Sequence, residues 1–544
     1  MRIGGAVRQM GLGVSLVLGL AVIGASIFLH AAPSASVVAD AARSGDLTAV
    51  RKLIKERAAI NAPASDGSTA LLWAAYHSDV EMAKTLIAAG AAVDVENRYG
   101  VTPLLQASRT GDVPMMRTLL EAGAQASRWH AEGETPLMAA ARTGNVEAIQ
   151  LLLSKGALIN AVDPFQEESA LMWASAEGHV AAVKALLAAG ADPNLKGHVS
   201  LLTDRKNADH PSGGFTALMF AARNGHRDVV KALMEGKADP KLTNADGLTA
   251  TMIAIVNDRF DLAKEMLDWG ADPNDGSLFY AVDMHDQTTD TRAQDATRMQ
   301  PDHPNTLTAL GLVKVLVDLG ADPNKPFVGG FHSTSMCCGP NNNSSPFYRA
   351  AVAADVEVLK LLLAHGAKVE WSPAEVKAED GKRVPPALNA AVGQTPLMAA
   401  MKGGNGPAIQ GGPGYTRSGA PPYREEGSRD PVEAAKVLLS AKANPNAKEP
   451  DGSTVLHQAV RNQQVAMIRA LVAAGASLDA VNNDKLTPLA LATTMKGDPP
   501  ARGKKDSKEQ TIAVLRELMH LGPDDAVPGL PAEKKDAPVE ALAP

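Results

Sequence analysis

The sequence is poor in the residues that most often form cross-links or metal centres. Its 544 residues include only two cysteines, Cys337 and Cys338, which are adjacent in the chain. Two cysteines exclude a disulfide framework and a zinc site built from several thiolates. Aromatic residues make up 4% of the chain, against 45% for all hydrophobic residues. We therefore expect a core of Ala, Leu, Val and Met in closely packed helices.

The chain also lacks an excess of positive charge. The chain has 53 Lys and Arg against 60 Asp and Glu, for a formal net charge of -7, which is unlike the basic footprint of a nucleic-acid binder. The sequence contains no HExxH, no GxSxG, no Walker loop and no dinucleotide fingerprint after a strand,. We expect no enzymatic activity, no cofactor and no nucleic-acid partner, so a role in binding proteins is favoured.

The first 39 residues contain no acidic side chain. Arg2 and Arg8 precede an apolar run from Met10 to Leu29, and small residues follow. This order is typical of a secretory signal, although the run is also long enough to span a bilayer as an uncleaved anchor. We expect residues 1–36 to be a signal peptide or an N-terminal membrane anchor. The rest of the chain would then be exported, either periplasmic, secreted or held at the membrane by this segment.

One seven-residue phrase returns along the chain. It appears as Thr69-Ala-Leu-Leu-Trp-Ala-Ala75, Thr102-Pro-Leu-Leu-Gln-Ala-Ser108 and Thr135-Pro-Leu-Met-Ala-Ala-Ala141. Similar phrases begin at Ser169, Thr216, Thr395, Thr454 and Thr487. The copies from Thr69 to Ser169 and from Thr454 to Thr487 follow one another at 33 or 34 residues. A second phrase keeps the same spacing, with glycines at Gly90, Gly123, Gly156 and Gly190.

The period near 33 residues and the Thr-Pro-Leu opening resemble those of the ankyrin repeat family. The resemblance covers roughly residues 37–522, with interruptions, and implies an all-α solenoid of about a dozen helix-turn-helix repeats. The residue types agree with this fold, because Thr caps a helix, Pro suits its first turn and Gly ends the second helix in a left-handed turn. No such repeat buries its own apolar faces, so each needs its neighbours.

The chain departs from this pattern in two ways. Arg57, Lys237 and Lys442 occupy the position of the terminating glycine, so we expect those turns to differ, because a left-handed conformation strains residues other than glycine,. Long insertions are expected between the two helices of a repeat, at 283–305, 403–430 and 496–510, and in the loops that join successive repeats, at 195–213, 325–344 and 371–392. We call these joining loops fingers.

The insertions suggest a division of the chain into four parts. Residues 1–36 form the signal or anchor, and residues 37–282 form N-terminal ankyrin repeats with few insertions. Residues 283–522 form C-terminal repeats with long insertions. Residues 523–544 are rich in Pro, Ala and charged side chains and are expected to be a disordered tail,.

A basic side chain recurs seven residues after the capping Thr, as Arg109, Arg142, Arg223, Lys402 and Arg461. The resemblance to ankyrin proteins implies that this position ends the inner helix on the concave face, which often forms a contact surface together with the fingers. The finger positions add Arg98, Tyr99, Trp129, His130 and Phe165, and aromatic and Arg side chains are favoured in binding hot spots. The hypothesis is a concave surface that binds an acidic protein surface, and the alternative is an ordinary solvated face.

Four aromatic residues occupy one equivalent position of the inner helix: Trp73, Trp173, Phe220 and Tyr280. A stripe on which a ligand stacks is one interpretation. Packing between adjacent repeats is favoured, because large aromatic side chains bury much area.

Two insertions contain residues that bind metals in other contexts. His332 lies close to Cys337 and Cys338, so a copper or zinc site or a redox-sensing disulfide is one hypothesis,. A loop whose cysteines form a static disulfide or remain thiols is favoured, because these ligands are too few for a closed zinc site. The second insertion, Asp283–Asn305, carries several Asp and His side chains. Its spacing matches no calcium-binding EF-hand, so we expect a solvated polar loop.

Three functions follow from these features. The first is a protein–protein interaction scaffold or adaptor that acts outside the cytoplasm through the concave face and the fingers. The second is a secreted effector that binds proteins of another cell. The third is a metal- or redox-active protein that uses the loop with Cys337 and Cys338. The first is favoured, with protein partners and with membrane contact only through the N-terminal segment.

Overall fold

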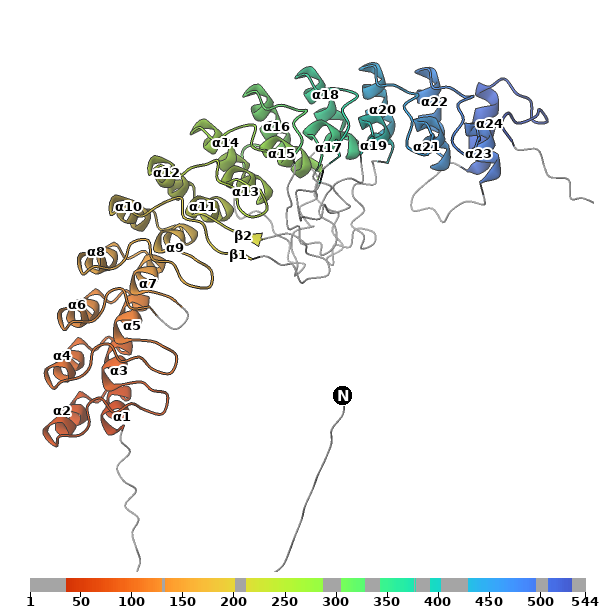
Figure 1. The fold of residues 1–544 in the computed structure, drawn as a ribbon. Helices are drawn as coiled ribbons and strands as arrows, with labels where there is room; N and C mark the ends of the chain where they lie inside the picture. Colours follow the sequence, from red (N-terminus) through yellow and green to blue (C-terminus); the bar gives the residue numbers. More distant parts are fainter. Residues whose placement is uncertain are drawn as a thin grey trace, which may run out of the picture.

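The computed structural model describes residues 36–129, 133–200, 212–286, 305–327, 343–375, 377, 392–402, 429–495 and 507–530. These residues form 24 α-helices and one sheet of two short strands. The helices alternate between an inner and an outer row, so that each inner helix and the outer helix after it make one repeat. The twelve repeats stack into a continuous arc with the inner helices on its concave side (Figure 1). The all-α solenoid of about a dozen repeats is therefore confirmed.

The inner helices are α1 (Val37–Arg43), α3 (Ala70–Tyr76), α5 (Pro103–Thr110), α7 (Pro136–Thr143), α9 (Ala170–Ala176), α11 (Ala217–Asn224), α13 (Ala250–Val256), α15 (Ser277–Asp286), α17 (Pro346–Val352), α19 (Pro396–Lys402), α21 (Val455–Arg461) and α23 (Pro488–Thr494). The outer helices are α2 (Leu47–Lys55), α4 (Val80–Ala88), α6 (Val113–Glu121), α8 (Val146–Ser154), α10 (Val180–Ala188), α12 (Arg227–Glu235), α14 (Phe260–Asp268), α16 (Ala309–Asp318), α18 (Val356–Ala364), α20 (Pro431–Ser440), α22 (Val465–Ala473) and α24 (Lys508–Leu518). Strands β1 (Val199–Ser200) and β2 (Ser212–Gly213) pair antiparallel in the finger between α10 and α11.

The helix ends follow from local sequence. In α5, the Thr102 hydroxyl accepts a hydrogen bond from the Leu105 backbone N–H at 3.2 Å, and Pro103 occupies the first turn. Gly111 then ends the helix with a φ of 67°, a conformation that glycine adopts without strain. The outer helix α6 is capped by Asp112, whose carboxylate accepts from the Met115 N–H at 3.1 Å. Side-chain caps of this kind satisfy backbone N–H groups that have no partner within the helix.

A polar side chain at the base of most fingers connects one repeat to the next. Asn61 accepts from the Ala92 backbone N–H at 2.8 Å and donates to the Gly90 carbonyl at 3.1 Å. Equivalent pairs of bonds are made by Ser127, Asn194, Asn274, Asn324 and Asn446. We call this series the finger ladder. Lys241 occupies the same position between repeats 6 and 7, and lysine has no acceptor atom for such a bond.

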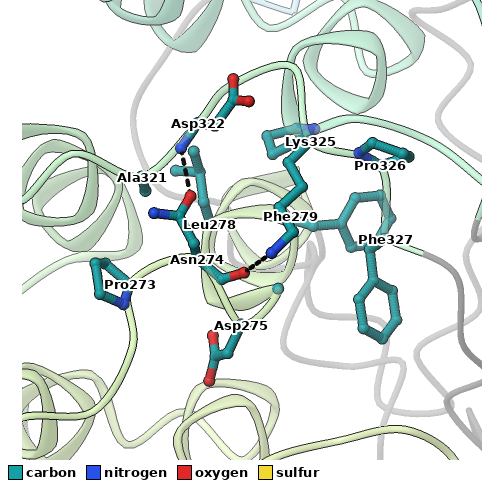
Figure 2. Close-up of a pocket in the computed structure, with 12 residues that line it drawn as sticks. Pro273, Asn274, Asp275, Leu278, Phe279, Ala321, Asp322, Lys325, Pro326 and Phe327 are labelled. Atoms are coloured by element: carbon teal, nitrogen blue, oxygen red, sulfur yellow. Dashed lines mark hydrogen bonds between the residues drawn. The ribbon is translucent and has the colours of Figure 1, made fainter.

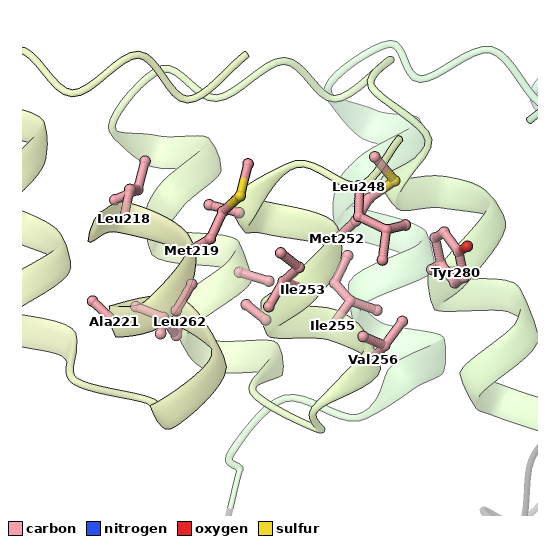
Figure 3. Close-up of a cluster of buried hydrophobic side chains, with 14 of the residues drawn as sticks. Leu218, Met219, Ala221, Leu248, Met252, Ile253, Ile255, Val256, Leu262 and Tyr280 are labelled. Atoms are coloured by element: carbon pink, nitrogen blue, oxygen red, sulfur yellow. The ribbon is translucent and has the colours of Figure 1, made fainter. Parts of the chain in front are cut away.

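The core lies between the two rows of helices and continues from repeat to repeat. Figure 3 shows its central part, where Leu218 and Met219 of α11 lie near Met252 and Ile253 of α13, all at most 2% exposed. Alanines such as Ala74, Ala107 and Ala140 are fully buried on the inner helices, which allows neighbouring helices to approach closely. The expected core of small and aliphatic side chains is present.

One expectation is confirmed and two others need correction. The turns at Arg57, Lys237 and Lys442 differ from the glycine turns, since their φ values are 58°, 66° and 71°, against 87–100° for the glycines at the equivalent positions. They are still left-handed, so the stack imposes this conformation despite the strain. The division at residues 282 and 283 falls inside α15, so the N-terminal repeats 37–282 and the C-terminal repeats 283–522 are one continuous stack.

The tail is also ordered in its first part. Residues 523–530 are described, and the Thr487 hydroxyl donates to the Pro528 carbonyl at 2.6 Å. Arg516 of α24 donates to the carbonyls of Gly522 and Asp525. These bonds tie the start of the tail to the last repeat, and residues 531–544 lie outside the described residues.

Candidate protein-binding surface

Of the five basic side chains predicted at the ends of the inner helices, those of Arg109, Arg142, Arg223 and Arg461 are described. These four lie on the concave side, but each contacts a neighbour within the chain. Arg109 of α5 binds Glu134 in the next finger, with Nε at 2.8 Å from the carboxylate. Arg461 of α21 donates to the side chains of Asp451 and Ser453 in its own finger, at 3.1 and 2.7 Å. These carboxylates reduce the positive charge that the arginines at the ends of the inner helices offer to a partner.

Arg142 and Arg223 stack on aromatic rings. The Arg142 guanidinium lies 5.1 Å from the Trp173 ring centre, and its Nε is 3.7 Å from the Glu177 carboxylate. The Arg223 guanidinium lies 5.2 and 5.5 Å from the rings of Phe220 and Phe215. These are cation–π distances. Loss of water around the Arg223 guanidinium lowers its pKa, against the opposing field of the Glu168 carboxylate, but an arginine remains charged at neutral pH.

The aromatic position of the inner helices serves packing between repeats. Trp73 and Trp173 are half-buried, and each ring is covered by an arginine of the preceding repeat, Arg43 for Trp73 at 5.4 Å and Arg142 for Trp173. Tyr280 is 1% exposed. Burial raises the pKa of its hydroxyl well above the ordinary value. The favoured interpretation, packing rather than ligand stacking, agrees with these contacts.

The aromatic side chains of three fingers are open to solvent. Tyr99 is 69% exposed, Trp129 is 62% exposed and Phe165 is 59% exposed. They come from three successive fingers, those between α4 and α5, α6 and α7, and α8 and α9. We call Tyr99, Trp129 and Phe165 the aromatic row. Arg98 is exposed beside Tyr99, and its backbone N–H donates to the Asp66 carbonyl of the preceding finger at 3.0 Å.

Sequence reasoning missed Tyr76, which is 59% exposed at the end of α3. Its ring packs edge-on against Trp73, with centres 5.6 Å apart. Tyr76 follows the capping Thr69 by seven residues, which is the spacing at which Arg109 and Arg142 follow their own capping threonines. A search of that position for aromatic as well as basic residues would have found it.

Several predicted site residues lie outside the described residues. These are His130, Cys337 and Cys338, together with residues 1–35 of the signal or anchor. Lys402 ends α19, but its side chain is not described. Within the described ranges, no group of three or more His, Cys, Asp and Glu side chains is placed to hold a metal ion, and no helix is long and apolar enough to cross a membrane.

The insertion Asp283–Asn305 begins inside α15, so the expectation of a solvated loop is wrong for Asp283 and His285, while residues 287–304 lie outside the described residues. Asp283 and His285 lie on α15 with side chains 6% and 0% exposed. Asp283 accepts from Arg349 Nε at 2.6 Å, while His285 Nδ1 lies 2.6 Å from Asp355. Arg429 donates to the His285 carbonyl at 2.7 Å and lies 3.2 Å from the Asp355 carboxylate. We call these five residues the ionic cluster.

The ionic cluster contains a His–Asp pair, the arrangement that orients a catalytic base in some hydrolases. Both side chains of the pair are fully buried, so a substrate has no access to them. Asp355 also caps α18 by accepting from the Val358 N–H at 3.2 Å. The pair therefore acts as a structural connection among α15, α18 and the segment that leads into α20.

A small cavity lies between the short finger before α15 and the finger after α16 (Figure 2). Asn274 crosses it, because its side chain accepts from the Asp322 N–H at 2.8 Å and its carbonyl accepts from Lys325 Nζ at 2.6 Å. Phe279 and Phe327 form the apolar wall. The volume is about 30 Å³, which is room for roughly one water molecule and far below the size of a substrate pocket.

Comparison with protein-family models agrees with this architecture. A family model described as ankyrin repeats (3 copies) matches residues 38–128, 126–197, 198–277 and 427–500, which together cover more than half of the chain. Among solved structures, the human ASB11 ankyrin repeat domain is similar, with 29% sequence identity, a TM-score of 0.34, and coverage of 40% of this chain and 90% of that chain. No curated protein matches the chain. The chain belongs to the ankyrin repeat family.

Proposed function

We propose that this chain is a protein–protein interaction scaffold that binds its partner through the concave face and fingers of repeats 2 to 5. Membership of the ankyrin repeat family supports a binding scaffold in general. The observation that carries the location is the exposure of Tyr76 and the aromatic row. The exposed large aromatic side chains of the described residues all lie between positions 76 and 165, and such side chains dominate the energy of protein interfaces.

The scaffold acts by binding and not by catalysis. The His–Asp pair of the ionic cluster is inaccessible, and the cavity beside Asn274 has room for about one water molecule,. The partner is a protein and not a small molecule, because a binding face that extends over several repeats suits a large partner.

Site-specific photo-crosslinking in the native cell tests this binding surface. A photoreactive amino acid replaces Tyr99 or Phe165 in separate variants, and Leu319 provides the matched control, since it is 50% exposed at the end of the outer helix α16. We expect discrete adducts from the two finger positions and none from Leu319. Absence of adducts from the fingers, or equal adducts from Leu319, would reject the surface.

The scaffold is proposed to act outside the cytoplasm, either periplasmic, secreted or anchored. The support is the sequence of residues 1–36, with its basic start and apolar run,. Protease accessibility of the full chain in intact and permeabilised cells tests this location. We expect the chain to be accessible outside the inner membrane and to become protected when residues 2–36 are deleted; protection of both forms would overturn the proposal.

A further inference from the structure

We propose that Glu168 and Arg223 together bind the side-chain amide of an Asn or Gln residue of the partner. This inference rests on the proposed function, since it gives the chemistry of one contact at the edge of the same surface. Three observations support it. In the described part of the chain neither charge has an ion-pair partner, the two groups are close enough to influence each other, and both are partly removed from water.

Glu168 lacks the arginine that binds its equivalent in the preceding repeat. Glu134 and Glu168 each come directly before the capping residue of an inner helix. Arg109 binds Glu134, with Nε at 2.8 Å from the carboxylate. Arg142 has the corresponding position for Glu168, but its guanidinium lies over Trp173, 5.1 Å from the ring centre. Within the residues that the structure describes, the Glu168 carboxylate accepts no hydrogen bond and forms no ion pair.

Arg223 differs from the other described arginines of its series. Arg109, Arg142 and Arg461 each have a carboxylate oxygen within 3.7 Å. Arg223 forms no ion pair in the described ranges, and its Nε makes only a long hydrogen bond of 3.4 Å to Oδ1 of Asn224. Stacking on two phenyl rings holds its guanidinium in place and leaves the terminal N–H groups to bind a partner,.

Backbone hydrogen bonds place the finger of Glu168 beside the finger that supports Arg223. The His198 N–H donates to the Gln166 carbonyl at 2.6 Å, two residues before Glu168. The N–H of the residue before His198 donates to the Phe215 carbonyl at 2.8 Å, and the Phe215 ring lies 5.5 Å from the Arg223 guanidinium. The open carboxylate and the open guanidinium therefore belong to neighbouring fingers.

The electrostatic effects on the two groups agree with this placement. Burial raises the pKa of the Glu168 carboxyl and the Asp163 carboxylate raises it further, whereas Arg223 opposes both effects. Glu168 in turn opposes the lowering of the Arg223 pKa by burial. The two groups influence each other without forming an ion pair. Because charged groups that lose water without a partner are unfavourable, this arrangement favours a ligand that satisfies both.

A side-chain amide satisfies both charges at once. Its carbonyl oxygen can accept from Arg223, while its NH2 group can donate to Glu168. A carboxylate in the same place would meet the like charge of Glu168, and an ammonium group would meet the like charge of Arg223. Hydrogen bonds to charged groups are stronger than those between neutral groups. The pair therefore selects Asn or Gln, and the acidic partner considered from the sequence is not favoured at this position.

Fluorescence anisotropy with the full chain tests the inference. The probes are three fluorescein-labelled peptides of equal length in which glycine alternates with Gln, Glu or Lys, at about 0.15 M salt to screen distant charges. We expect the Gln peptide to bind about tenfold more tightly than the other two. Glu168→Gln should shift the preference to the Glu peptide, because Glu168 no longer opposes the charge of Arg223. Arg223→Gln should shift it to the Lys peptide for the converse reason.

The matched control is the ion pair of Arg117 and Glu147 on the outer helices, whose side chains are 51% and 66% exposed. Arg117→Gln and Glu147→Gln make the same changes of charge on the convex side, so the preference for the Gln peptide should remain. Circular dichroism should show equal helix content in all four variants, since each altered side chain is exposed or half-buried.

Three results would overturn the inference: no binding or no preference for the Gln peptide, an unchanged preference in both Glu168→Gln and Arg223→Gln, or the same shifts in the control variants. Photo-crosslinks from Phe165 together with any of these results would reject the amide contact and leave the scaffold proposal standing. Absence of crosslinks from the fingers would reject the scaffold surface itself, whichever peptide binds.

Discussion

At the scale of single residues, a leucine at the second position of an inner helix, as in α7 and α9, should contribute strongly to stability. Leu137 and Leu171 are each 1% exposed in the continuous core. We expect Leu137→Ala and Leu171→Ala each to lower the free energy of unfolding by about 2–5 kcal/mol, because truncation removes buried area and leaves a cavity. Chemical denaturation followed by circular dichroism measures this loss.

The control for this prediction is Leu158→Ala. Leu158 is 64% exposed at the base of a finger, so its truncation should change the free energy of unfolding by less than about 0.5 kcal/mol. If the buried and exposed variants lost a similar free energy of unfolding, the inner-helix leucines would not be core residues.

His457 makes stability depend on pH. Its Nδ1 accepts from the Thr454 backbone N–H at 3.2 Å, and its Nε2 lies 3.0 Å from the Leu486 carbonyl, so the neutral ring carries its hydrogen on Nε2,. Burial lowers the pKa of His457 below its ordinary value of 6.5, despite the hydrogen bond to Leu486. Between the lowered pKa and 6.5, the unfolded chain binds a proton that the folded chain does not. The free energy of unfolding should therefore fall as pH decreases from 6.5 to the lowered pKa of His457. Above pH 6.5, the contribution of His457 should not change with pH.

Comparison with His457→Leu isolates this effect from the other histidines. Leu105 occupies the equivalent position in α5 and is 1% exposed, so leucine fits the site. Denaturation at several pH values should show a smaller loss of stability between neutral and acidic pH in the variant than in the unaltered chain. Identical pH profiles would contradict the prediction.

At the scale of helices and their connections, the ionic cluster stabilises the contact between repeats 8 and 9. Arg349 of α17 binds Asp283 of α15, and the two side chains are 7% and 6% exposed. We expect Arg349→Met to lower the free energy of unfolding by about 3–5 kcal/mol, because it removes the cation that contacts a buried carboxylate. Denaturation of the purified chain checks this value.

The double variant Arg349→Met/Asp283→Leu is the matched comparison. It removes both charges and replaces them with apolar side chains, which is often close to neutral for stability. We expect it to recover most of the loss of the single variant. A double variant as unstable as Arg349→Met would mean that the pair does not act as a charge pair.

The sequence predicted the helices better than it predicted the ionic cluster, and the reason is the range of the interactions. Thr102, Pro103 and Gly111 specify their helix through contacts within nine residues, so a local pattern is sufficient. Asp283 and His285 bind partners 66 and 70 residues away, in another repeat. Asp283 and His285 lie next to a long insertion, and no nearby residue in the sequence indicates their partners. The sequence therefore suggested that they belong to a solvated loop.

The candidate surface was predicted only in part for a related reason. The positions of Tyr99, Trp129 and Phe165 follow from the repeat, and their exposure agrees with a finger position. The pairing of Arg109 with Glu134 and of Arg142 with Trp173 and Glu177 depends on the geometry between repeats. The repeat period therefore located the arginines of the concave face, but it could not show that nearby carboxylates and aromatic rings already bind them.

At the scale of the whole molecule, the junction between repeats 6 and 7 is a weak point of the stack. Lys241 interrupts the finger ladder there,. The outer helices α12 and α14 are also the least closely packed of the adjacent outer pairs in the described part of the chain. An exposed contact between Arg227 and Glu265 joins these helices, and such pairs add little. In a linear array, one weak interface divides the stack into two cooperative blocks.

We therefore expect the unaltered chain to unfold in two steps, with one block on each side of Lys241. Lys241→Asn should restore the ladder by providing an acceptor for the next repeat, as Asn194 does one junction earlier at 2.8 Å, and should strengthen this interface by about 0.5–1.5 kcal/mol. The two steps should then move closer together in urea denaturation followed by hydrogen exchange. Lys241→Ala removes the charge without adding an acceptor, so it should leave their separation unchanged. An equal shift in the Asn and Ala variants would show that the lysine charge, and not the missing hydrogen bond, weakens the junction.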